Sequence, residues 1–211
     1  MTFYEFLDKF INKDVKHLIL KKVWPLVRGI AHLFEDRTKQ DIRQEDWFKL
    51  TSYLKTGDII LTVGKSPFSG VFIPGLVKHA AIVNSFHHPK VVEAISGGVV
   101  ETNLYDFLKN KIIFYLVRPK FANNYVMERA AKEAEDRIGL PYDNIFSFDN
   151  DRVYCSELVY LAYKQACALM GKPFPLKTTI LFEEEMYLPD DIRTDTDSWE
   201  IIYTNDIRRH Q

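Results

Sequence analysis

Five short segments rich in isoleucine and valine follow one another between residues 55 and 119, and this run constrains the fold more than any other feature of the sequence. In chain order they read KTGDIILTVG, VKHAAIVNS, KVVEAI, GVVET and KIIFYLVRP. β-branched residues favour strands, and the Gly, Pro, Asn and Ser residues between the segments favour turns. Because short connections favour antiparallel pairing, the run predicts an antiparallel sheet.

Two helices are predicted after these strands. The segment 122–141, ANNYVMERAAKEAEDRIGLP, opens with Asn and ends with Gly and Pro, which are helix start and stop signals. A second helix is predicted from Cys155 to about Met170, where Gly171 and Pro173 follow. The acidic tail after it is predicted to be loop-like until a last strand at WEIIYT, residues 199–204. Helices packed on an antiparallel sheet define the α+β class.

The first fifty residues have a different character. Apolar residues recur at helical spacing from Phe3 to Phe34, interrupted by Pro25, which predicts two amphipathic helices or one kinked helix. The charged segment 35–46, EDRTKQDIRQED, is predicted to be a solvated connection. We therefore predict a helical extension over residues 1–50, packed on a domain over residues 51–211. Core packing is favoured over membrane-surface contact for the amphipathic face, although both readings remain open.

Charge and cysteine content exclude several classes of protein. The 28 basic and 29 acidic residues nearly cancel, so the chain has no overall field that favours nucleic acid. Its two cysteines, Cys155 and Cys167, lie twelve positions apart on one predicted helix, about 18 Å by helical rise, which is too far for a disulfide. Charged residues interrupt every apolar run near Met1, so neither a signal peptide nor a membrane span is predicted there. We expect a cytoplasmic protein with reduced thiols that begins at Met1.

Cys155 is the first candidate for a functional residue. A cysteine at a helix N-terminus has a lowered pKa, although an isolated cysteine is more often a small buried side chain. A nucleophilic cysteine also needs a base, and His79 lies in an otherwise apolar strand, where its burial requires a partner. The other five histidines are explained as surface or helix-face residues. They are His17, His32, His87, His88 and His210.

Glu93 is the expected partner of His79. It interrupts the next apolar strand fourteen residues later, so the two side chains can face each other across an antiparallel pair. The alternatives are a purely structural His–Glu pair, or a Glu93 that faces solvent.

These residues carry a family resemblance. The ordered segments KTGDIIL, KHAAIV, VVEAISGGVVET and GLPYDNIFSFDNDRVYCSELVYLAY resemble the permuted NlpC-type papain-like amidases of the YiiX/YaeF group over roughly residues 50–165. The resemblance implies Cys155 as nucleophile, His79 as general base and Glu93 as the residue that orients the imidazole. Chain order does not matter to such a triad, because geometry defines it. The N–H of Cys155 is the expected first donor of an oxyanion hole, and Tyr142 and Tyr154 either support the site or simply pack.

The predicted function is that of a cysteine hydrolase that cleaves amide bonds through an acyl-enzyme and needs no metal or organic cofactor. The expected substrate is a small peptide, amide or acyl compound. Alternatives are a lipid or thioester acyl hydrolase or acyltransferase, an inactive binding module, and a zinc site at the same three residues. No CxxC or HExxH spacing favours zinc. The apolar segment before His79 is predicted either to line a substrate channel or to fold onto the core; its candidate residues are Phe68, Phe72 and Ile73.

Overall fold

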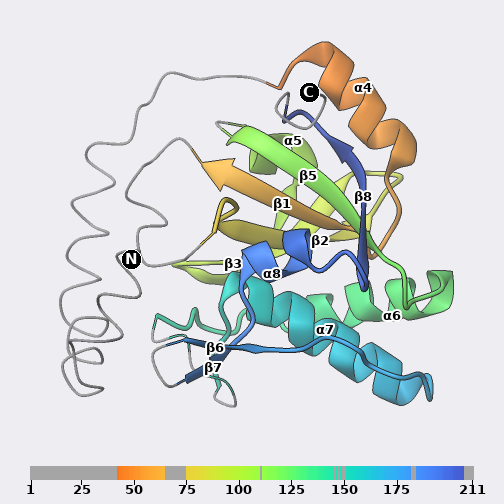
Figure 1. Cartoon of the computed structure of the whole chain (residues 1–211). Helices are drawn as coiled ribbons and strands as arrows, with labels where there is room; N and C mark the ends of the chain where they lie inside the picture. Colours follow the sequence, from red (N-terminus) through yellow and green to blue (C-terminus); the bar gives the residue numbers. More distant parts are fainter. Residues whose placement is uncertain are drawn as a thin grey trace.

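The computed structural model describes residues 42–64, 75–109, 111–144, 146, 148, 151–181 and 184–206 (Figure 1). Most of the predicted N-terminal extension therefore lies outside the described residues. The apolar segment that contains Phe68, Phe72 and Ile73 lies outside them too, so its two readings stay predictions. Within the described ranges, no helix has both the length and the apolar character needed to cross a membrane.

Six antiparallel strands form the main sheet, as predicted, in the order β4-β3-β2-β1-β5-β8. Their bounds are β1 Ile59–Gly64, β2 His79–Ser85, β3 Lys90–Ile95, β4 Gly98–Asn103, β5 Lys111–Pro119 and β8 Trp199–Thr204. The first five are the predicted isoleucine- and valine-rich segments, and β8 is the predicted last strand. The α+β class is confirmed.

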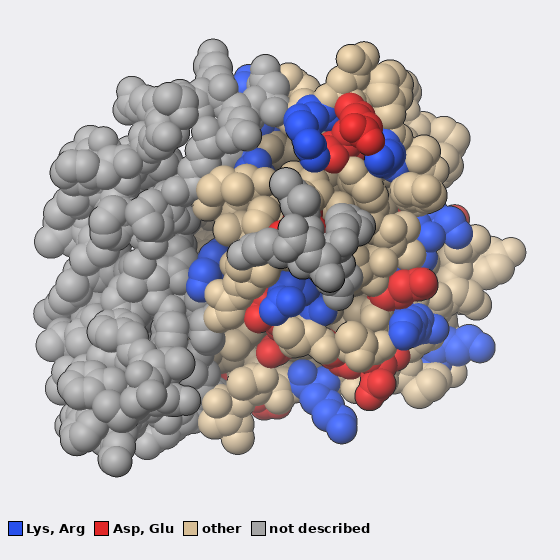
Figure 2. Space-filling model, turned by 45° about the horizontal axis from the view of Figure 1, so that its top comes forward, with Lys and Arg blue, Asp and Glu red and all other residues tan. Residues whose placement is uncertain are grey.

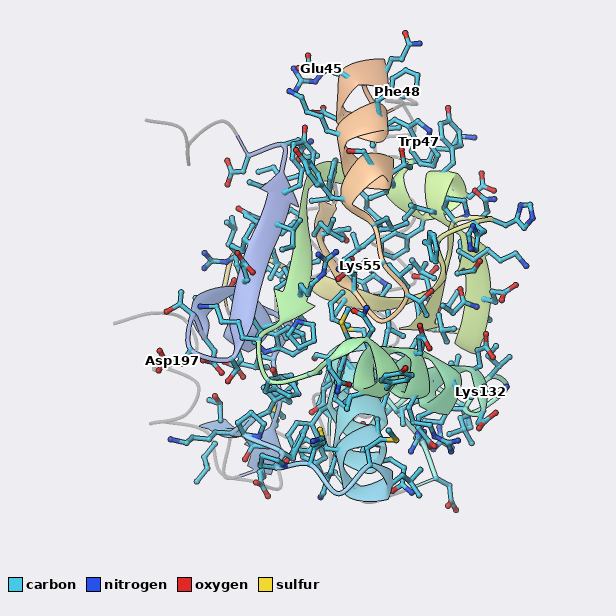
Figure 3. The ribbon with its side chains drawn as sticks, turned by 90° about the vertical axis from the view of Figure 1, so that its right-hand side faces the viewer. Glu45, Trp47, Phe48, Lys55, Lys132 and Asp197 are labelled. Carbon is cyan, nitrogen blue, oxygen red and sulfur yellow. The ribbon has the colours of Figure 1, made fainter. Side chains whose placement is uncertain are left out.

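Helices cover both faces of this sheet, and two apolar clusters fill the space between the layers (Figures 1 and 3). Helices α6, Asn124–Glu135, and α7, Cys155–Leu169, cover one face. Both correspond to predicted helices, and the side chain of Asn123 starts α6 by accepting the N–H of Val126 at 3.0 Å. Helices α4, Gln44–Tyr53, and α5, Leu104–Leu108, cover the other face.

Two parts of the chain differ from the sequence prediction. Helix α4 begins at Gln44, so the last three residues of the predicted connection are helical. The division predicted at residue 50 falls within this helix and stays a prediction. The predicted loop-like tail, which begins at residue 182, instead contains the strand β7 Glu184–Met186 and the helix α8 Pro189–Thr194. β7 pairs with a further short strand, β6 Thr179–Leu181, just before that tail. The start of α8 has a physical cause, because Pro189 occupies its first turn and Asp191 accepts the N–H of Leu188 at 2.8 Å.

The entry to β1 is fixed by a tight turn. Gly57 has a φ of 88°, and its carbonyl accepts a hydrogen bond from the hydroxyl of Tyr163 at 2.5 Å. The next residue, Asp58, is fully buried and pairs with Arg118 at 2.7 Å. These contacts tie β1 to α7 and β5, and so they set the sheet against the helix that begins at Cys155.

Basic and acidic side chains are interspersed over the described part of the face shown in Figure 2. This mixture agrees with a formal net charge of −1.

Candidate active site

Cys155 is the first residue of α7, and its residue is only 1% exposed. Its sulfur is hydrogen bonded to the His79 side chain and to backbone groups of Ala80 and Ser156. Ala80 lies just beyond the last paired residues of β2 and β3, which are Ala81 and Glu93. Ala80 pairs with Leu61 of β1 but has no partner on β3, and its backbone is hydrogen bonded to the sulfur.

The ring of His79 connects the sulfur to a carboxylate. Its Nε2 lies 2.7 Å from Oε2 of Glu93, as predicted, so Nδ1 is the ring nitrogen left for the sulfur of Cys155. The ring of Phe107, from α5, packs on the imidazole with 5.7 Å between ring centroids. The structure therefore brings together the three side chains that the sequence singled out.

Thr102 on β4 completes this line of contacts. Its hydroxyl donates to Oε1 of Glu93 at 2.7 Å, so each carboxylate oxygen has one partner and the carboxyl plane is fixed. Sequence reasoning did not find Thr102. The available signal was the strand period: Thr102 pairs with Val91, which lies two residues from Glu93 on the same side of β3.

The charges in this group favour an ion pair. Burial alone would lower the pKa of His79, but its contacts with Cys155 and Glu93 outweigh burial and raise the pKa to about 9. Burial would raise the pKa of the Cys155 thiol, but the contact with His79 and the hydrogen bonds from Ala80 and Ser156 lower it. Burial likewise opposes ionisation of Glu93, while His79 and Thr102 hold its pKa below the usual value. At neutral pH the arrangement favours a thiolate beside an imidazolium.

The two candidate tyrosines lie in the apolar cluster under the sheet. The hydroxyl of Tyr154 accepts the backbone N–H of Tyr187 at 3.0 Å, and burial raises the pKa of this tyrosine. Tyr142 forms a parallel bridge with Val153, the second residue before Cys155. These contacts favour packing and support of the loop that leads to Cys155; an oxyanion role for either tyrosine stays a prediction.

Comparison with known proteins identifies the family. The permuted papain-like amidase enzymes of the YaeF/YiiX, C92 family match residues 53–203. The chain belongs to this family.

Two relatives agree with this membership. Uncharacterized protein YiiX of Escherichia coli (strain K12) is 31% identical over 134 residues, covering 58% of this chain and 64% of that protein. The chain thus spans less than two thirds of that relative's length. The crystal structure of metalloprotein yiiX from Escherichia coli O157:H7 has a TM-score of 0.58 and 22% identity, with 71% of this chain and 96% of that chain covered. This second likeness shows a shared fold.

Glu157, in the first turn of α7, is a further buried group that the sequence reading did not single out. Its residue is 1% exposed, Oε2 accepts the N–H of Tyr154 at 3.2 Å, and Oε1 has no hydrogen-bond partner among the described residues. Burial raises the pKa of this carboxyl to about 8, against the opposing hydrogen bond from Tyr154 and with the help of nearby Asp143. Glu157 is therefore protonated over much of the neutral range, and it adds little negative charge to the first turn of α7.

A metal site was the alternative for these three residues. In this structure Glu93 is hydrogen bonded to the ring nitrogen of His79. Among the described residues, no three His, Cys, Asp or Glu side chains form a group suited to a metal.

Proposed function

We propose that the chain is a cysteine amidase in which Cys155 is the nucleophile, His79 is the acid and base, and Glu93 orients the imidazole. One observation carries this proposal: sulfur, imidazole and carboxylate form a continuous line of contacts, with a thiol of lowered pKa beside an imidazole of raised pKa. Family membership supports hydrolysis of a small amide.

The resting state is the ion pair, so the proton of Cys155 is already on His79 before substrate binds. The thiolate attacks the carbonyl carbon of the amide, and the electron pair of the C=O bond moves to oxygen. The backbone N–H of Cys155, at the start of α7, is a suitable donor to that oxyanion. When the tetrahedral intermediate collapses, the C–N bond breaks, the imidazolium gives its proton to the leaving amine, and a thioester remains on the sulfur.

Neutral His79 then takes a proton from water as the water attacks the thioester. Collapse of the second intermediate releases the carboxylic acid and restores the thiolate beside the imidazolium. Glu93 stays ionised throughout, since Thr102 and His79 satisfy both of its oxygens. Its role is to hold the ring so that Nδ1 faces the sulfur, and to stabilise the positive charge on the ring.

The proposal is tested with fluorogenic amides of small acyl groups and by intact-mass detection of the thioester after acid quenching. We expect Cys155→Ala to abolish both turnover and the mass increase, and His79→Asn to slow acylation by at least about a thousandfold. Cys167→Ala is the matched control, because Cys167 lies buried near the other end of the same helix and should be dispensable. An acyl adduct that persists in Cys155→Ala, or that maps to Cys167, would remove the nucleophile assignment.

A further inference from the structure

The residues on either side of Cys155 bind the main chain of a single distant residue. The hydroxyl of Tyr154 accepts the N–H of Tyr187 at 3.0 Å, and the hydroxyl of Ser156 donates to the carbonyl of Tyr187 at 2.6 Å. Tyr187 is itself anchored, because it is 1% exposed and its own hydroxyl accepts the indole N–H of Trp199 at 3.1 Å. The first turn of α7 is thus hydrogen bonded to Tyr187, a buried residue between β7 and α8.

Three residues further on, the same segment holds the approach to His79. The carboxylate of Asp190 accepts the N–H of Val77 at 3.3 Å and is also hydrogen bonded to the backbone of Leu76. Arg193 fixes this carboxylate through two contacts of 2.6 and 2.9 Å. At Gly75 the backbone passes so close to Asp190 that an added Cβ would lie 2.3 Å from the Cβ of Asp190. Asp190 therefore bonds the backbone of Leu76 and Val77 and packs against Gly75, shortly before β2 begins at His79.

We infer that Tyr187–Asp190, which we term the 187–190 bridge, is a positioning element that sets the sulfur of Cys155 against the ring of His79. This inference rests on the proposed function and adds to it the device that holds the reacting pair together. The two reactive groups come from separate elements, α7 and β2. A short segment that is bonded to both elements beside these groups sets the distance between the sulfur and the ring. A displacement of about 1 Å at a reacting group can lower the rate by a large factor.

If the bridge positions the sulfur, loosening it changes the thiol pKa of Cys155, which a general loss of stability does not. The depressed pKa of the Cys155 thiol depends on its contact with His79 and on the N–H groups of Ala80 and Ser156. Loosening the bridge weakens those contacts and raises the thiol pKa. Loss of stability elsewhere in the domain leaves the contacts within the folded state unchanged.

The experiment measures the rate of iodoacetamide alkylation of Cys155 against pH in the full chain, with the modified peptide identified by mass spectrometry. Tyr154→Phe removes the acceptor for Tyr187, and Asp190→Ala removes the acceptors for Leu76 and Val77. We expect each variant to raise the thiol pKa by about one unit, a tenfold change in the ionisation constant. Asp190→Asn, which keeps an acceptor oxygen, should restore most of the wild-type value.

Tyr163→Phe is the matched control. It removes another buried tyrosine hydroxyl from the same helix, and that hydroxyl bonds Gly57 away from the bridge. We expect Tyr163→Phe to lower the melting temperature and to leave the thiol pKa unchanged. An unshifted pKa in Tyr154→Phe, or an equal shift in Tyr163→Phe, would overturn the inference; Tyr154→Phe carries the test alone if Asp190→Ala does not fold. A wild-type thiol with an ordinary pKa would instead refute the proposed function itself, and the bridge would then have no ion pair to position.

Discussion

Replacement of Glu157 by glutamine offers a sharp test of the electrostatics around Cys155. The side chain is buried, it accepts the N–H of Tyr154 through Oε2, and its other oxygen has no hydrogen-bond partner in the part of the chain that the structure describes. Glutamine has nearly the same shape and keeps an acceptor oxygen for Tyr154. It differs in having no carboxyl proton to lose, so the substitution removes one titration and little else.

The expected magnitude follows from the pKa of this carboxyl in the two states. In the unfolded chain Glu157 titrates near 4.5, whereas burial raises its pKa to about 8 in the folded protein. Below pH 4.5 both states hold the proton, and the group does not alter stability. As pH rises from there, the unfolded chain releases the proton while the folded protein keeps it, so the free energy of unfolding falls until the pH passes about 8. At about 1.4 kcal/mol for each pKa unit, the full effect is at most about 5 kcal/mol.

The assay is urea denaturation of the wild type and of Glu157→Gln at pH 5, 7 and 9. The difference in free energy of unfolding between variant and wild type should increase by about 2–5 kcal/mol from the lowest to the highest pH. Only the wild type loses stability as the unfolded chain releases the proton of Glu157. His79 also titrates in this range, but both proteins contain it, so its contribution cancels in the difference. Glu128→Gln, the same change at an exposed position of α6, is the control and should show no such gain. Parallel stability profiles for wild type and Glu157→Gln would show that the buried carboxyl is not held protonated.

Three further predictions concern the site and its support. Glu93→Gln removes the carboxylate that helps to raise the pKa of His79, so we expect the alkaline limb of the pH–rate profile, near 9 in the wild type, to move to lower pH. Thr102→Val should lower kcat about tenfold with little change in KM, because Oε1 of Glu93 loses its donor, and Thr102→Ser should recover most of the loss. Gly57→Ala should lower the free energy of unfolding, measured in urea, by at least about 2 kcal/mol. Gly57 has a φ of 88°, and the new Cβ would lie 2.5 Å from the carbonyl oxygen of Met127. The control Gly97→Ala should leave the free energy of unfolding nearly unchanged, because an added Cβ there meets nothing within 4 Å.

Local sequence signals were sufficient for the strands and for the long helices. The isoleucine- and valine-rich segments became β1 to β5, and the Asn, Gly and Pro signals bounded α6 and α7 within a few residues. The pairing of His79 with Glu93 was also predictable, since two ionisable side chains in adjacent apolar strands each need a partner. In these cases one physical requirement, either burial or hydrogen bonding, acts within a short stretch of chain.

The features that were not predicted depend on contacts between distant segments. Helix α8 and strand β7 lie in an acidic stretch whose composition is typical of loops, and tertiary packing overrides that composition. Thr102 supports Glu93 only because β4 pairs with β3 in one particular register. The contacts of Tyr187 with Tyr154 and Ser156 span 33 and 31 residues, and no local pattern specifies them.

The charge balance around the sulfur explains why these non-local contacts matter together. A thiolate, an imidazolium and a carboxylate carry a net charge of −1 in a mostly buried site, which is costly unless nearby dipoles or charges offset it. The backbone hydrogen bonds of Ala80 and Ser156 favour the thiolate, while the Thr102 hydroxyl and the field of Lys111 favour the carboxylate. Ionised Glu157 would add a further negative charge two residues after Cys155 in the first turn of α7, and its raised pKa avoids this over much of the neutral range. Above about pH 8, therefore, ionisation of Glu157 should oppose the thiolate and raise the apparent pKa of Cys155, and Glu157→Gln should remove that effect from the alkylation profile.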